Sequence, residues 1–198
     1  MKTTIVDYGA GNLRSVQNTL DELGANYETT SDPEVVARAE KIILPGVGHF
    51  GQMMRAMDEL GLRDAVLERI RAGVPFLGIC IGLQCLFEAS EESPGSKGLA
   101  VFSGAVQRFA GNMRIPHMGW NELTRLRDCR LLRGLPERVF TYFAHSYRAP
   151  ITQATAATCT YNRPYAAVIE SKNIYAVQFH PEKSGPTGLR VMQNFLQL

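Results

Sequence analysis

The run VPFLGICIGLQ at residues 74–84 constrains the fold of this chain more than any other stretch. An apolar segment ends there in Cys80, which stands between Gly78 and Gly82, and helical spacing of apolar residues resumes directly afterwards. This pattern predicts a nucleophile elbow, in which a buried strand turns sharply into a helix. The residue at such a turn is held in a strained backbone conformation that lifts its side chain above the sheet.

The residues around Cys80 suit such a turn. Gly78 and Gly82 lack a Cβ, so the strand and the helix can approach each other closely. The helix begins with its positive end near the sulfur, which favours a thiolate. The alternative interpretation is a buried cysteine that ends a core strand, because free cysteine is among the most buried residue types.

Strand-like and helix-like segments alternate in the first half of the chain. Apolar runs predict buried strands at residues 3–8, 25–30, 41–44 and 74–79. Amphipathic spacing predicts helices between them at 13–23, 33–40 and 50–71, the last interrupted at Gly61. From residue 99 the pattern becomes β-rich, at 101–109, 139–148, 155–161 and 166–178, before a closing helix.

This alternation indicates an α/β fold with a mostly parallel central sheet, covered by helices on both faces and continued by an antiparallel extension. The chain has 198 residues, 45% of them hydrophobic, so we expect one domain spanning residues 1–198. Reactive groups in such sheets gather beyond the carboxyl ends of the strands. Cys80 and the loop at residues 45–48 both follow such strand ends.

The segment His180-Pro181-Glu182, after the last predicted strand, supplies the groups that a cysteine nucleophile needs. In an extended segment residues i and i+2 point to the same side, which would bring Glu182 beside the imidazole of His180. A cysteine, a histidine that relays the proton and a carboxylate that orients the histidine form a catalytic triad. The alternative is a histidine that caps a strand and a solvated glutamate.

An oxyanion hole would complete such a site. The sequence PGVG at residues 45–48 offers backbone N–H groups of Val47 and Gly48 on a loop of unusual dihedral freedom, and the N–H of Ile81 directly follows the cysteine. The alternatives are an ordinary strand-to-helix turn and a phosphate loop. The second is weaker, because no Lys-Ser or Lys-Thr follows the glycines.

Charge and cysteine usage exclude several classes of function. The net charge is +2, from 21 basic and 19 acidic residues without a long run of one sign, so we expect neither a nucleic-acid nor a membrane partner. The four cysteines form no Cys-x-x-Cys pair, which argues against a metal site or a disulfide framework and fits a reducing cytoplasm. The longest uncharged stretch, residues 72–87, is too short and too broken to span a bilayer.

Together these motifs resemble the class I (triad) glutamine amidotransferases, and more narrowly the glutaminase subunits of imidazole glycerol phosphate synthases. The resemblance covers almost the whole chain. It rests on residues 7–16, 45–48, 78–84, 116–121, 144–147 and 178–184. It implies a flavodoxin-like glutaminase fold, no cofactor, and cleavage of L-glutamine to glutamate and ammonia through a thioester.

The resemblance also assigns roles to individual residues. It implies that Cys80 is the nucleophile, His180 the general base and acid, and Glu182 the residue that orients His180. It implies that Gln84 and Glu92 contact the head group of glutamine, and that its amino-acid end is contacted by Gly48, His145 and Ser146. Without the resemblance, Glu92 would be interpreted as a solvated helix end.

The implied partner is a cyclase subunit with a (β/α)8 barrel, which forms a heterodimer with the glutaminase. That subunit uses the ammonia to make imidazole glycerol phosphate and AICAR in histidine biosynthesis. The partner surface is implied to include Asn12, Met118, Trp120 and Lys183. Two alternatives are a paralogous glutaminase that feeds another synthase, such as one for a surface sugar, and a redox-sensing protein on the same fold. A complete His-Pro-Glu argues against the sensor, which needs no proton relay.

Overall fold

Parallel strands form the half of the main sheet that carries Cys80. The computed structural model describes residues 1–9 and 13–198 and contains a nine-stranded sheet of order β2-β1-β3-β4-β12-β11-β10-β7-β8. The first five strands in this order pair in parallel. Their bounds are β2 (Tyr27–Thr30), β1 (Thr3–Val6), β3 (Ile42–Leu44), β4 (Phe76–Ile79) and β12 (Ile174–Val177).

Antiparallel pairing forms the other half of this sheet. Its strands are β11 (Arg163–Ser171), β10 (Thr155–Tyr161), β7 (His117–Arg125) and β8 (Val139–His145). A smaller three-stranded sheet joins β5 (Phe87–Ser90), β6 (Phe102–Arg108) and β9 (Tyr147–Arg148). The predicted α/β fold with an antiparallel extension is therefore confirmed.

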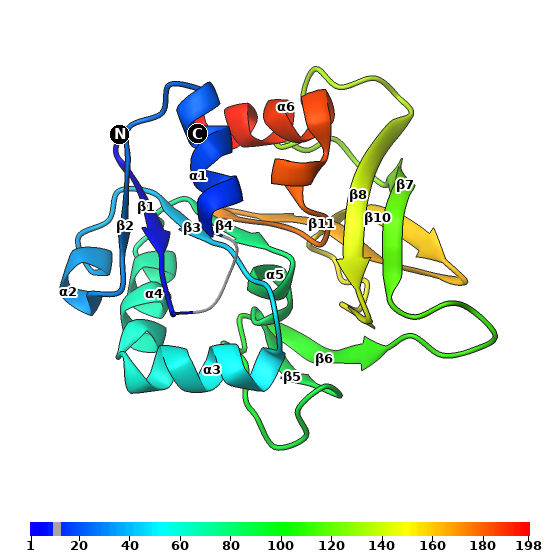
Figure 1. Ribbon diagram of the computed structural model, residues 1–198, viewed down its shortest axis with the longest axis horizontal. Helices are drawn as coiled ribbons and strands as arrows, with labels where there is room; N and C mark the ends of the chain where they lie inside the picture. The colour runs from blue at the N-terminus through cyan, green and yellow to red at the C-terminus, as the bar shows by residue number, and fades with distance from the viewer. Residues whose placement is uncertain (10–12) are drawn as a thin grey trace.

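Helices cover both faces of the parallel half (Figure 1). On one face lie α1 (Leu13–Glu22) and α6 (Gly185–Leu196), and on the other α3 (Phe50–Glu59) and α4 (Leu62–Arg71). Gly61, with φ of 68°, separates α3 from α4. This is the position at which the sequence predicts an interruption of the helix. The short elements are α2 (Pro33–Val36), α5 (Ile81–Gln84) and the 3-10 turn η1 (Pro181–Lys183).

Several element boundaries differ from the prediction. β1 ends at Val6 rather than at residue 8, because its partner β2 ends at Thr30, opposite Val6. α2 ends at Val36 rather than near residue 40, and beyond it the carbonyl of Ala39 accepts two hydrogen bonds from Arg69. β5 and β7 were not predicted. β7 buries only two of its nine residues, so its sequence lacks a clear apolar alternation.

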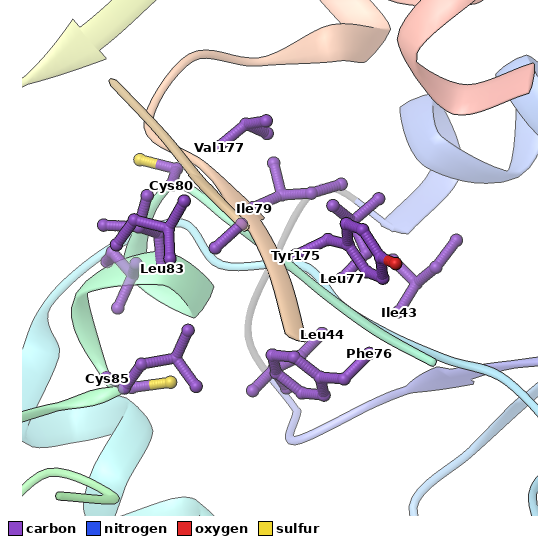
Figure 2. Packing of buried hydrophobic residues seen from close by; sticks show 14 of the residues in the cluster. Ile43, Leu44, Phe76, Leu77, Ile79, Cys80, Leu83, Cys85, Tyr175 and Val177 are labelled. Carbon is purple, nitrogen blue, oxygen red and sulfur yellow. The ribbon is translucent and has the colours of Figure 1, made fainter. Parts of the chain in front are cut away.

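A dense apolar core lies directly beneath Cys80. Figure 2 shows Leu44 of β3 and Phe76, Leu77 and Ile79 of β4 packed together below the cysteine, next to residues of β12. The turn from β4 into α5 leaves no room for side chains, since a Cβ on Gly78 would overlap the carbonyl oxygen of Gly82. A Cβ on Gly82 would in turn overlap the carbonyl oxygen of Leu44. Both glycines are therefore needed for the close approach that the sequence predicts.

Candidate active site

Cys80 stands at the sharp turn between β4 and α5. Its φ of 54° and ψ of −106° lie outside the ordinary regions for a residue with a side chain. Its N–H donates to the carbonyl of Val177 at 2.8 Å, which ties the turn to β12. The backbone therefore has the strained strand-to-helix geometry that the sequence predicts at this position, and the predicted turn is confirmed.

His180 and Glu182 meet next to this turn. The Nδ1 atom of His180 lies 2.8 Å from Oε1 of Glu182, and only 3% and 4% of the two side chains are exposed. The sequence predicts His180 and Glu182 on an extended segment. In the structure Pro181 begins the 3-10 turn η1, and Glu182 lies within it. The predicted contact is present, but a tight turn produces it rather than strand alternation.

The protonation of His180 depends on both neighbours. Burial lowers the pKa of His180, but the hydrogen bond and charge of Cys80, followed by those of Glu182, raise it to about 10 overall. At neutral pH the imidazole is therefore held in its protonated form beside the sulfur. An imidazolium beside a cysteine sulfur can pass its proton to a leaving group after the sulfur has attacked.

A cavity of about 380 Å³ opens above Cys80 and His180. A volume of this size suits a small molecule such as an amino acid. The residues predicted to bind glutamine all line it, namely Gly48, Gln84, Glu92, His145 and Ser146. Glu182 contacts His180 and lies outside the lining. The geometry thus brings together every residue of the predicted glutamine site, although their roles remain predictions.

Glu92 holds the start of α3. Its Oε2 accepts the N–H of Phe50 at 2.7 Å, and Oγ of the adjacent Ser93 accepts the N–H of Gly51 at 3.0 Å. The N–H groups in the first turn of a helix have no partner within the helix, so these side chains satisfy them. The half-buried Glu92 therefore fixes the end of the predicted oxyanion loop at residues 45–48, in addition to lining the cavity.

The residues that carry the predicted oxyanion donors line the same cavity as Cys80, but the N–H of one of them is engaged elsewhere. The N–H of Val47 donates to the Tyr8 hydroxyl at 3.3 Å, and this hydroxyl lies 3.4 Å from the Val47 carbonyl oxygen. Gly48 has φ of 97°, a conformation that favours glycine. Ile81 is the first residue of α5, so its N–H has no acceptor within the helix. Sequence reasoning did not identify Tyr8, which follows β1.

His145 belongs to a buried hydrogen-bonded chain. Its Nδ1–H donates to the carbonyl of Tyr147 at 2.7 Å, and its Nε2 accepts from the hydroxyl of Tyr165 at 3.2 Å. That hydroxyl in turn lies 3.2 Å from Nδ1 of His117. Burial lowers the pKa of His145 to about 3 and that of His117 to about 4. Both imidazoles are therefore neutral at pH 7, and His145 is not a competing general acid.

The described residues of the predicted partner surface lie at or near the cavity. Met118 and Trp120 on β7 are 64% and 57% exposed, and Met118 and Lys183 also line the cavity. The ring of Tyr142 contacts both Trp120 and Lys183. Its centre lies 6.2 Å from the Trp120 ring and 5.9 Å from the Lys183 ammonium. The Tyr142 carbonyl accepts the His180 N–H at 2.9 Å. Asn12, the remaining predicted surface residue, lies outside the described residues.

Two further classes of site are absent from the described part of the chain. None of the helices in residues 1–9 and 13–198 combines the length and the apolarity that a bilayer crossing needs. The same residues contain no group of three or more His, Cys, Asp or Glu side chains arranged to hold a metal ion.

Solved structures share this fold. A crystal structure described as that of a glutamine amidotransferase matches with a TM-score of 0.77 at 21% identity, covering 98% of this chain and 97% of the other. The glutaminase domain of Trypanosoma brucei CTPS with bound acivicin matches with a TM-score of 0.67 at 16% identity, covering 100% and 94%. At these identities the comparison establishes the fold alone.

Sequence relatives define the family. A family model described as glutamine amidotransferase class-I matches residues 4–198. The imidazole glycerol phosphate synthase subunit HisH of Methanothermobacter thermautotrophicus is 47% identical over 98% of this chain and 97% of its own. The protein of the same name from Thermococcus kodakarensis is 46% identical over 98% of each chain. The chain therefore belongs to the class-I glutamine amidotransferases and, within them, to the family of imidazole glycerol phosphate synthase subunit HisH.

Proposed function

We propose that this protein is the glutaminase subunit of an imidazole glycerol phosphate synthase and that Cys80, His180 and Glu182 are its catalytic triad. The observation that carries the proposal is the meeting of three groups at one end of a cavity. They are a cysteine at a strained turn, a buried histidine beside it, and a carboxylate 2.8 Å from the far nitrogen of that histidine. Membership of the HisH family supports it independently.

The chemistry follows from these positions. The Cys80 thiolate attacks the carboxamide carbon of glutamine, and the negative charge that forms on the oxygen is stabilised by backbone N–H groups near residues 47, 48 and 81. His180 gives its proton to the leaving nitrogen, the C–N bond breaks, and ammonia and a thioester result. His180 then takes a proton from water, the hydroxide attacks the thioester carbon, and the C–S bond breaks to release glutamate.

The ammonia goes to a cyclase subunit with a (β/α)8 barrel, which binds over the exposed face at Met118, Trp120 and Lys183. Met118 and Lys183 line the cavity and are also exposed, so the cavity opens toward this face. An apolar and aromatic patch of this kind is suited to protein association. With its partner the enzyme forms imidazole glycerol phosphate and AICAR.

A reconstitution experiment tests this function. The purified chain is mixed with the barrel cyclase subunit of an imidazole glycerol phosphate synthase and its phosphoribosyl formimino substrate, and formation of imidazole glycerol phosphate is measured with glutamine and with ammonium salts. We expect the barrel alone to use ammonia only, and the mixture to use glutamine as well. A mixture that forms no complex and gains no glutamine-dependent synthesis would contradict the partner. In that case, glutamine hydrolysis by the chain would indicate a glutaminase for another synthase.

Replacement of Glu182 by Gln should lower glutaminase turnover by at least about tenfold without unfolding the protein. The carboxylate accepts from Nδ1 of His180 and stabilises the imidazolium, and an amide of the same shape cannot carry that charge. The kcat for glutamate release measures the effect, with His180→Asn as the more severe reference. Glu28→Gln removes a carboxylate paired with Lys2 at the far edge of the sheet and is the matched control. Equal turnover in Glu182→Gln and wild type would remove Glu182 from the triad.

A further inference from the structure

The carboxamide of Gln178 lies against the sulfur of Cys80. Gln178 follows β12 directly and precedes His180 by two residues, and its side chain is fully buried. Its Nε2 lies 3.6 Å from Sγ of Cys80, within the range of a hydrogen bond to sulfur. We propose that Gln178 is a further catalytic residue, whose amide N–H donates to the Cys80 sulfur and stabilises the thiolate. This inference rests on the proposed role of Cys80 as nucleophile.

The orientation of the Gln178 amide is set by groups other than the sulfur. The Oε1 atom of Gln178 accepts a hydrogen bond from Nε2 of Gln84 at 3.0 Å. This Nε2 atom of Gln84 also donates to the carbonyl of Tyr147, at 2.9 Å. Because a carbonyl only accepts, the NH2 end of Gln84 must face Tyr147 and Gln178. The oxygen of Gln178 therefore faces Gln84, and its NH2 group is directed at Cys80.

Gln84 and His145 hold this arrangement from the other side. The Tyr147 carbonyl accepts from both Gln84 and Nδ1–H of His145, at 2.9 and 2.7 Å. The tautomer of His145 is fixed in turn, because its Nε2 accepts from Tyr165. Gln84 is buried together with Gln178, so the two amides have a single satisfied arrangement in this part of the molecule. Gln84 is accordingly a positioning residue for Gln178, in addition to its place on the cavity wall.

A neutral donor at this position helps at two stages of the reaction. The imidazolium of His180 faces the thiolate before the attack, and it forms again when His180 takes a proton from water before the C–S bond breaks. The amide of Gln178 does not titrate, so it can stabilise the sulfur anion before the attack and again when the C–S bond of the thioester breaks. Hydrogen bonds to charged groups are stronger than those between neutral groups. The donor therefore favours both the formation of the thiolate and its departure.

The other groups that act on the sulfur come from separate elements. His180 stands at the start of η1 with Glu182 behind it. The phenols of Tyr8, after β1, and Tyr165, on β11, interact with the Cys80 charge, and the pKa of each is raised mainly by burial. Both phenols are therefore neutral over the working range of pH. The two phenols therefore do not contribute to a change in the pH response of Cys80 on substitution of Gln178.

The test measures the rate at which iodoacetamide alkylates Cys80 as a function of pH, followed by mass spectrometry of the peptide that contains it. Gln178→Met keeps the length of the side chain and removes the donor. We expect the midpoint of the profile to move up by about one pH unit, so that alkylation below the midpoint slows about tenfold. The kcat for glutamate release should fall in parallel, with KM for glutamine changed little, because Gln178 is not part of the cavity lining.

Asn194→Leu is the matched control. Asn194 on α6 is a buried amide that donates to the carbonyls of Leu131 and Arg133, so its loss has the general cost of removing a buried amide. We expect its alkylation profile to match that of wild type. Gln178→Glu is a second variant, whose side chain has the same shape as that of glutamine. It is used if the Gln178→Met protein does not fold. A carboxylate facing the sulfur should move the midpoint up at least as far.

A profile in Gln178→Met or Gln178→Glu that coincides with that of wild type would overturn the role of Gln178 as a donor, even where turnover falls. A separate readout covers the proposed function. Wild-type protein alkylated fully at Cys80 that still released glutamate would show that Cys80 is not the nucleophile, whatever the Gln178 variants do.

Discussion

Replacement of Cys80 by alanine or serine should abolish glutamine hydrolysis, with a fall in turnover of at least about a thousandfold. The strained backbone at residue 80 presents this sulfur, next to His180, to the cavity, and alanine carries no nucleophile. Serine has the right shape, but its hydroxyl is far harder to ionise than a thiol. The measurement is glutamate release by the chain in complex with the proposed barrel partner.

The other cysteines provide the controls. Burial raises the pKa of Cys85 to about 12 and that of Cys159 to about 11, so neither is a thiolate at neutral pH. Cys129 is half-buried in the segment between β7 and β8, and its pKa is also raised by burial. Conservative replacements of these three should leave hydrolysis intact. Synthesis from ammonium salts should survive Cys80→Ala, because the barrel then receives ammonia from solution. Wild-type glutamate release by Cys80→Ala would refute the triad.

The isolated chain should be a slow glutaminase that accelerates by about a hundredfold or more when the barrel subunit and its nucleotide ligand are bound. One oxyanion donor is typically worth that much in turnover. In the free chain the N–H of Val47 donates to the hydroxyl of Tyr8 and is not available to the substrate oxygen. Reorientation of this one peptide would complete the oxyanion hole.

A short path connects the proposed partner face to the proposed catalytic groups. Lys183 directly follows Glu182, and its ammonium lies over the ring of Tyr142, which also contacts Trp120. The Tyr142 carbonyl accepts the N–H of His180, so we expect docking on this face to affect the proposed catalytic histidine through one residue. An enzyme gated in this way does not consume glutamine when no acceptor is present.

Glutamate release by the chain alone, with the barrel, and with the barrel and saturating nucleotide ligand measures this activation. Tyr8→Phe removes the hydroxyl that holds Val47 and should raise the rate of the free chain. Tyr27→Phe removes a hydroxyl that donates to Asp21 on the surface and is the matched control. Full activity of the isolated chain, unchanged by partner and ligand, would contradict the gating of the oxyanion loop.

Local patterns were sufficient for the elbow and for the order of the elements up to residue 84. The positions of Gly78 and Gly82 on either side of Cys80 already predict the turn, because only residues without a Cβ fit at those two positions between β4, α5 and β3. The alternation of apolar strands and amphipathic helices likewise predicts a parallel sheet, since each element carries its own periodicity. β7 was missed because its two faces differ little in polarity.

The contacts that complete the site were decided by the tertiary structure. Val47 meets Tyr8, Gln84 meets Gln178, and the N–H of Phe50 meets Glu92 across separations of 39, 94 and 42 residues. The sequence alone determined that a cysteine would stand on a strained turn with a histidine and a glutamate at another strand end. Only the order and register of the strands decided which polar groups face each other there, because hydrogen bonds between distant segments depend on where the folded backbone places them and leave no periodic signal in the chain.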